Sequence, residues 1–256
     1  MTHKILLSIT VLLLAYTSVS GQHKTARDMI RERKGILRLS EWAGLLSIHT
    51  NGVALGYRKS NIEKYYLNTF YQYEMANIRH PREVSRSVDP AGNRRSVYAY
   101  GKQNTLLVLR ASKGRVKYYS EKARTGNVGI GSSYLWGITL GLLKPYYLTV
   151  RKGHDDRAES TYIKYSNETA DVFLDPVQIR RAAPFFTGIK ETKLIPGAHA
   201  QASLHLTFRG NTPLVLDMEV GAKGDLFVRN IPIMVTEQNR PFFVSLFVSL
   251  HIGKRK

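Results

Sequence analysis

The sequence contains no cysteine among its 256 residues. This absence excludes a disulfide-stapled scaffold, a thiolate metal site and a cysteine nucleophile. Acidic residues are also scarce, with 19 Asp and Glu against 38 Lys and Arg, which gives a formal net charge of +19. A surplus of this size favours an anionic neighbour, such as nucleic acid, a phosphorylated lipid surface or an acidic polymer.

Long apolar runs are lacking, apart from one near the start. An apolar run covers residues 5–15 after Lys4, and small residues follow it up to Gly21. This order is typical of a secretory signal peptide over residues 1–21, because the run is short of the ~18 residues that a spanning helix needs. Export makes nucleic acid an unexpected partner. Residues 22–40 are basic, and either a short amphipathic helix or a charged N-terminal extension fits them.

Residues 41–256 are dominated by a two-residue alternation. In residues 242–253 one parity is wholly apolar, while the other carries small or polar side chains. Similar alternation covers 65–75, 128–142, 200–208 and 214–223, and further candidates are 45–58, 97–110, 116–122, 146–150 with 161–165, and 226–234. A period of two predicts β-strands. No stretch after residue 40 predicts a long helix.

The length of these strands favours a membrane barrel over a soluble β-sandwich. Sandwich strands average about five or six residues, whereas about ten are needed to cross a bilayer at a tilt. A sheet in lipid must close, because every backbone group needs a partner. The 15 Tyr and 9 Phe, many at strand ends, suit the interfaces of such a barrel. We therefore expect an all-β transmembrane antiparallel β-barrel of about 8–10 strands over residues 41–256, preceded by the signal peptide.

A family resemblance supports the same fold. The segments "LLSIHTNGVALGYRK", "YEMANIRHPREV", "GKQNTLLVLR", "LGLLKPYYLTV" and "IPIM" together resemble an uncharacterised family of outer-membrane β-barrel proteins from Bacteroidota. The resemblance runs through most of the chain after the signal peptide. It implies residence in the cell outer membrane, and it brings no catalytic residues with it.

The candidate catalytic residues are serines and histidines two positions apart. Three Ser-x-His triplets occur: Ser47–His49, Ser203–His205 and Ser249–His251. Residues i and i+2 share a face of a strand, and the alternation makes that face the lumen. Because a barrel closes by pairing its first and last strands, we expect Ser47, His49, Ser249 and His251 to come together. They would be either hydrogen-bonded lumen filling or a lipid-hydrolysing dyad.

Charged residues give two further expectations and no metal site. Asp217 and Glu219 lie on the polar face of one strand, and lumen arginines such as Arg110 would pair with them. The segment "HDDRAE" at 154–159 has carboxylates for a cation, but it has the pattern of a solvated loop. No metal and no cofactor are expected.

Two long connections, 79–95 and roughly 166–198, interrupt the strand pattern. Loops of this length are uncommon unless they are functional or disordered. The basic residues are expected in such connections, in the N-terminal extension or in the lumen. Five arginines in the first connection are candidates to contact lipid phosphates: Arg79, Arg82, Arg86, Arg94 and Arg95.

These features indicate a small outer-membrane barrel with a structural, interaction or narrow-pore role. The alternatives are a lipid- or envelope-modifying barrel enzyme, and an accessory subunit of an outer-membrane assembly or secretion complex. The expected partners are outer-membrane lipid, including anionic lipopolysaccharide, or an acidic envelope protein. The sequence does not decide whether the chain is an enzyme.

Overall fold

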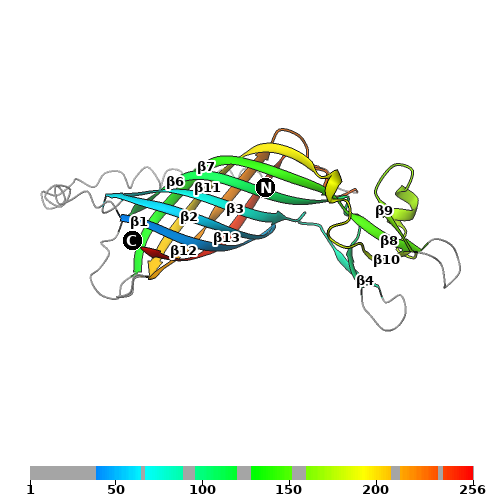
Figure 1. Ribbon diagram of the computed structural model, residues 1–256, viewed down its shortest axis with the longest axis horizontal. Coiled ribbons are helices and arrows are strands. Elements are labelled where there is room, and N and C mark those ends of the chain that lie inside the picture. Colours follow the sequence, from blue (N-terminus) through cyan, green and yellow to red (C-terminus); the bar gives the residue numbers. More distant parts are fainter. Residues whose placement is uncertain are drawn as a thin grey trace, which may run out of the picture. The chain divides into compact units, whose positions relative to one another are not determined.

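A closed antiparallel barrel of eight strands forms the body of the computed structural model (Figure 1). The structure describes residues 39–64, 67–88, 96–119, 128–151, 160–208, 214–235 and 239–255. The expected signal peptide and almost all of the basic segment 22–40 therefore lie outside the described residues. Within the described part of the chain, no helix is both long and apolar enough to cross a membrane.

The barrel strands follow each other around the ring in antiparallel order, and the first strand pairs with the last. Their bounds are β1 (Leu39–His49), β2 (Gly52–Lys64), β3 (Leu67–Ile78), β6 (Asn104–Tyr118), β7 (Val128–Pro145), β11 (Lys193–Phe208), β12 (Leu214–Phe227) and β13 (Phe242–Arg255). The ring order is β1-β13-β12-β11-β7-β6-β3-β2. Eight strands agree with the predicted fold class, and the interior of such a barrel is just wide enough for side chains to fill it.

The two-residue alternation sorts side chains between the lumen and the outer surface. On β13 the outward parity is Phe242, Val244, Leu246, Val248, Leu250 and Ile252, all exposed. The inward parity carries Phe243, Ser245, Phe247, Ser249 and His251, all buried. The strand therefore has a fully apolar outside and a mixed inside, as its sequence predicts.

The predicted strand over 45–58 is wrong, because this segment is the β1–β2 hairpin. Thr50 and Asn51 form the turn, and Gly52 follows with a φ of 146°. A Cβ at Gly52 would lie 2.1 Å from the carbonyl oxygen of Asn77, so the close approach of β3 requires glycine here. The Asn-Gly pair is a hairpin signal, not the bulge that a single strand would need.

The predicted strand over 226–234 is also wrong beyond Phe227, where β12 ends. Ile231, Ile233 and Met234 fold into one mouth of the barrel instead. They belong to a buried apolar cluster of ten residues, and the other seven come from the barrel strands, among them Ile78 and Leu106. The amides of Gln103 and Asn104 donate to the Ile233 carbonyl at 2.8 and 3.2 Å. This apolar plug closes the mouth at the end that carries the long connections.

Two small sheets form outside the barrel ring, from residues of the long connections. The first pairs β4 (Ser85–Val88) with β5 (Ser96–Ala99), and the second has the order β10 (Ile179–Ala182), β8 (Tyr147–Arg151), β9 (Ser160–Lys164). The predicted strands at 146–150 and 161–165 thus pair with each other and not with the barrel. The candidate 97–110 is likewise divided between β5 and β6, and β6 extends to Tyr118, so the start of the candidate 116–122 belongs to the same strand.

A second apolar core holds these extra elements together. The helix α3 (Ala170–Leu174) places Phe173 against Tyr98, Leu148, Val150 and Ile179, and all five side chains are buried. Burial also raises the pKa of Tyr98. The described residues of the long connections therefore form a folded layer with its own core. We call this layer the cap (the described residues within 79–103, 146–192 and 228–241).

A polar contact fixes the last part of the cap next to β11. The short helix η2 (Ile189–Glu191) ends with Glu191, whose carboxylate accepts a hydrogen bond from Lys164 at 2.5 Å and from Tyr147 at 2.8 Å. These two donors, Lys164 first, lower the pKa of Glu191. The contact joins β8, β9 and η2 across residues that are distant in sequence.

Candidate functional site

The lumen holds a buried charge cluster around Glu219 of β12. The Arg58 guanidinium donates to both carboxylate oxygens of Glu219, at 2.6 and 3.0 Å, and its Nε donates to Gln72 at 2.9 Å. The Nδ1 atom of His205 lies 2.8 Å from Glu219, and Gln201 donates to the same carboxylate at 3.2 Å. Glu219 is completely buried. Side chains of β2 and β11 thus converge on one carboxylate of β12.

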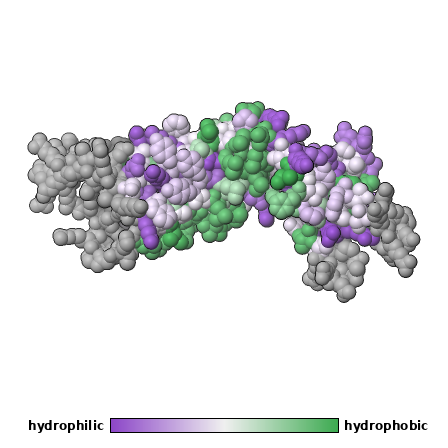
Figure 2. Space-filling model, viewed as in Figure 1, coloured by the Kyte–Doolittle hydropathy of each residue, from purple (hydrophilic) through white to green (hydrophobic). Residues whose placement is uncertain are grey.

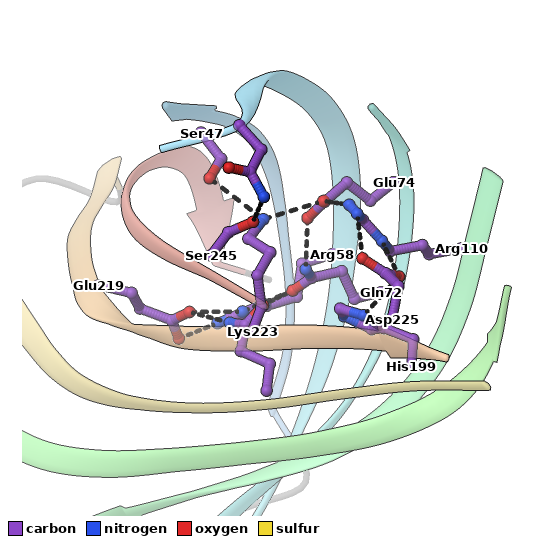
Figure 3. A network of polar contacts seen from close by, with 12 residues as sticks. Ser47, Arg58, Gln72, Glu74, Arg110, His199, Glu219, Lys223, Asp225 and Ser245 are labelled. Atoms are coloured by element: carbon purple, nitrogen blue, oxygen red, sulfur yellow. Dashed lines mark hydrogen bonds and ion pairs between the residues drawn. The ribbon is translucent and has the colours of Figure 1, made fainter. Parts of the chain in front are cut away.

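A second lumen cluster surrounds Arg110 of β6 (Figure 3). Arg110 makes a bidentate contact with Asp225, at 2.8 and 2.7 Å, and a further hydrogen bond to Glu74. Lys223 donates to Glu74 at 3.0 Å, and His199 Nδ1 lies 3.1 Å from Asp225. Burying these charges is tolerable because each faces an opposite charge and accepts or donates several bonds.

Ion pairs form in the lumen as predicted, but the predicted partner of Asp217 and Glu219 was wrong. Asp217 and Glu219 face the lumen as predicted, but Arg110 binds Asp225 and Glu74. Glu219 takes Arg58, and Asp217 lies 3.3 Å from Nε2 of His205. Arg58 is a lumen residue that the sequence analysis did not identify. Its parity relative to Ala54 and Ser60 on the same strand was the available signal.

The four candidate catalytic residues line the seam where β1 meets β13. Ser47 lies directly opposite Ser249, as the closure argument requires, and both are buried. The histidines do not meet, because His49 is opposite Phe247 while His251 is opposite Leu45. The expectation that all four residues come together is therefore wrong for the histidines.

The seam offers no serine–histidine dyad in the described part of the chain. Both ring nitrogens of His49 and of His251 lack a hydrogen-bond partner there. Ser47 instead accepts a long hydrogen bond from Lys223, at 3.4 Å. A nucleophilic serine needs a histidine within about 3 Å, so this arrangement favours lumen filling.

The candidate phosphate contacts lie in the cap. Arg79, Arg82 and Arg86 are exposed on the connection between β3 and β6. The Arg86 guanidinium stacks 4.4 Å from the centre of the Tyr100 ring, which leaves its edge available to an anion. Arg94 and Arg95 lie outside the described residues, as does the segment 154–159.

Four cations that the sequence analysis placed elsewhere lie on the outer surface of the barrel. Lys59 of β2 and Lys113, Arg115 and Lys117 of β6 are exposed. Their parity matches that of outward residues such as Leu109 on β6. The expectation that basic residues lie only in connections, the N-terminal extension or the lumen is therefore wrong for these four.

Comparisons with known proteins give structural neighbours but no family. No family model matches the chain, and no curated protein matches it either. Among solved structures, Ail, the attachment invasion locus protein of Yersinia pestis, aligns with a TM-score of 0.37 at 9% identity, over 86% of this chain and 97% of that one. It has also been solved in complex with the heparin analogue sucrose octasulfate.

Two further solved structures align over most of both chains. The N-terminal β-barrel domain of Pseudomonas aeruginosa OprF aligns with a TM-score of 0.34 at 8% identity, over 86% of this chain and 98% of that one. Neisserial surface protein A aligns with a TM-score of 0.37 at 6% identity, over 85% of this chain and 94% of that one.

Proposed function

We propose that this protein is an outer-membrane barrel that holds the cap at the membrane surface as an interaction module, and that it is not an open pore. The observation that carries the proposal is the filled lumen. Two buried charge clusters cross it, and the plug of Ile231, Ile233 and Met234 closes one mouth. A barrel filled in this way serves as an anchor and a scaffold.

Residence in a membrane is inferred from the outer surface. Closure removes both sheet edges, and the outward parities of β11, β12 and β13 are apolar over most of their length. An exposed apolar surface of this extent needs lipid around it. The signal peptide expected at residues 1–21 and the resemblance to Bacteroidota barrels are parts of the same proposal.

The orientation follows from the lengths of the connections. Long connections join β3 to β6, β7 to β11 and β12 to β13 at one end of the barrel, where the short turn at 50–51 also joins β1 to β2. The first strand β1 begins and the last strand β13 ends at the opposite end. Outer-membrane barrels have short periplasmic turns and longer extracellular loops. We therefore infer that the cap faces the cell exterior.

The partner proposed for the cap is anionic envelope material, with lipopolysaccharide as the first choice. Basic side chains outnumber acidic ones in the described parts of the cap, and Arg79, Arg86 and Arg181 pair with no carboxylate described there. Phe185 and Phe186 of the cap are also exposed, Phe186 at 74%. Arginine clusters bind phosphate groups through charge-assisted hydrogen bonds, and exposed aromatic rings suit the membrane interface.

A first test measures residence and conductance together. The purified protein should migrate faster on a gel before heating than after, fractionate with the outer membrane and give no stable channel in a planar bilayer. Recovery in the soluble periplasmic fraction without heat-modifiable migration would contradict the barrel in a membrane. A steady conductance of the folded protein would contradict the filled lumen.

A second test measures binding to lipopolysaccharide. The triple variant Arg79→Gln, Arg82→Gln, Arg86→Gln should bind immobilised lipopolysaccharide about tenfold or more weakly than the parent at low salt, because several charged contacts are removed. Adding Arg94→Gln and Arg95→Gln should weaken binding further. The matched control is Lys254→Gln, Arg255→Gln, Lys256→Gln, which removes the same charge at the end of β13 and from the residue that follows it in the sequence. Equal loss in both triple variants would show non-specific attraction only.

A further inference from the structure

The four outward cations form a cluster on one side of the barrel, which we call the outer cation cluster (Lys59, Lys113, Arg115 and Lys117). All four are exposed, and none makes an ion pair with a carboxylate in the described part of the chain. Lys113 Nζ lies 5.6 Å from the centre of the Tyr71 ring. In Figure 2, this face of the barrel is pale to hydrophilic in the half nearer the C-terminus, and hydrophobic in the other half.

The register of the strands gives the height of this cluster along the barrel. One continuous row of paired residues runs around the ring through Val244, Gly224, Ala200, Trp136, Lys113, Tyr71, Lys59, Trp42 and Lys254. It leaves β13 at residue 244 and returns to the same strand at residue 254, ten residues further along. Because the strands of a closed barrel tilt by about 35–45°, the row descends steadily from the cap end to the terminal end.

Lys113 lies in the middle of this descent. Four steps along the row separate it from Val244, and four steps separate it from Lys254. It is therefore level with the midpoint between these two residues on β13, and the outward residues of β13 from Phe242 to Ile252 are all apolar. Lys113 on β6 thus lies at the same depth as Val248 and Leu250 on β13.

A bare cation at this depth is unfavourable. Lys or Arg on the lipid face of a barrel costs about 2–4 kcal/mol at the midplane. The side chain can extend toward the nearer interface, and Arg115 and Lys117 lie progressively closer to it on the same strand. The three cations of β6 therefore form a track from the terminal-side surface to the middle of the apolar band.

An apolar groove of about 710 Å³ begins where this track ends. Its floor is the small side chain of Ala111, between the larger Tyr73 and Ile138 on the neighbouring strands. Further outward side chains complete its walls: Leu55, Tyr57, Met75, Leu109, Leu140 and Pro196. Ala111 precedes Lys113 by two residues on the outward face of β6, a separation of about 7 Å.

We propose that this face is a binding site for one anionic phospholipid from the leaflet at the terminal end of the barrel. An acyl chain occupies the groove over Ala111, and the phosphate lies against Lys113 and Arg115, drawn toward the middle of the apolar band. The inference rests on the proposed membrane residence. A second copy of the chain is a poor occupant, because a symmetric contact would place like charges together.

Retention of lipid by the purified barrel tests the site. Native mass spectrometry of the detergent-solubilised protein with added phosphatidylglycerol should show one bound lipid, and the same experiment with zwitterionic phosphatidylcholine should show far less. The double variant Lys113→Gln, Arg115→Gln should retain phosphatidylglycerol about tenfold less. Ala111→Phe, which fills the groove and keeps all the cations, should reduce retention to a similar extent.

The controls separate this proposal from the one on which it rests. Lys254→Gln removes an outward cation at the rim and should leave retention unchanged. Heat-modifiable migration of each variant verifies that the barrel is folded. If the parent itself lacks heat-modifiable migration, the proposed membrane residence is overturned, and the lipid site with it. With a folded parent, equal retention of both lipids, or no effect of Ala111→Phe, overturns the lipid site. Retention that depends on the cations but not on the groove would show attraction of the headgroup alone and would also overturn the proposed site.

Discussion

Replacing Glu219 with Gln is expected to lower the free energy of unfolding by about 3–5 kcal/mol, because the change leaves a buried arginine without its counter-charge. Glu219 is fully buried and accepts hydrogen bonds from both terminal nitrogens of Arg58. His205 and Gln201 use the same carboxylate. A neutral amide of the same size keeps the packing and removes the attraction, so the loss reports on charge.

Urea unfolding of the barrel in lipid vesicles, followed by the gel shift and by tryptophan fluorescence, measures this effect. Glu191→Gln is the matched control, since Glu191 is an exposed carboxylate in the cap, and its change should stay within about 1 kcal/mol. The pair replacement Arg58→Met, Glu219→Leu should recover most of the loss, because an apolar pair of similar volume avoids both desolvation costs. A single variant as stable as the parent would contradict a cluster that holds the barrel together.

The sequence predicts which residues face the lumen, but not which of them pair. Alternation along one strand is local, so the inward side of Asp217 and Glu219 follows directly from their neighbours. The pairing of Arg58 with Glu219 joins residues 161 positions apart. It depends on the positions of β2 and β12 across the barrel, which the sequence does not contain. The same reason explains why Arg110, chosen by its parity, has Asp225 and Glu74 as its partners.

Two strand predictions failed because alternation has more than one physical origin. The segment 45–58 alternates on both sides of a two-residue turn, so the hairpin had the appearance of one strand with a bulge. Ile231 and Ile233 are buried on either side of the half-buried Pro232, yet no strand forms there. These side chains are buried because the connection crosses the mouth of the barrel and presents one side to its apolar rim. The alternation of the sequence indicated correctly which side chains are buried, but its interpretation as a strand was wrong.

The outer cation cluster shows a similar limit. The sequence analysis examined the apolar parities of the clearest strands, and those contain no cation. On β6 the outward parity changes from Leu107 and Leu109 to Lys113 and Arg115 within one strand. Its depth became visible only through the register of all eight strands. An uneven apolar band is thus a property of the closed ring and not of any single strand.

Truncating the plug is expected to open the cap end of the lumen without unfolding the barrel. Ile231 and Ile233 are each 1% exposed, and an Ile→Ala change at such a site costs about 2–5 kcal/mol. The double variant Ile231→Ala, Ile233→Ala should therefore weaken the docking of this connection by at least about 4 kcal/mol. Most of the barrel contacts do not involve the connection, so heat-modifiable migration should persist.

Limited trypsin digestion measures the opening directly, because the exposed Arg229 lies two residues before Ile231 and is followed by Asn230, whereas Arg240 is followed by Pro241 and resists trypsin. Cleavage of a transiently opened segment follows its open population, so a loss of about 4 kcal/mol should accelerate cleavage by on the order of 10²–10³. Val228→Ala, in the same connection but 74% exposed, is the control and should leave the rate unchanged.

Conductance of the same plug variant then separates the two barriers in the lumen. The charge clusters around Glu219 and Arg110 lie on the strands and remain after the plug is loosened. The double variant should therefore still conduct no measurable current, even with its connection cleaved. If loosening the plug alone produces a channel, the connection is a gate and the charge clusters leave a water path between them. If cleavage does not accelerate, the packing of Ile231 and Ile233 into the mouth is not what holds the connection in place.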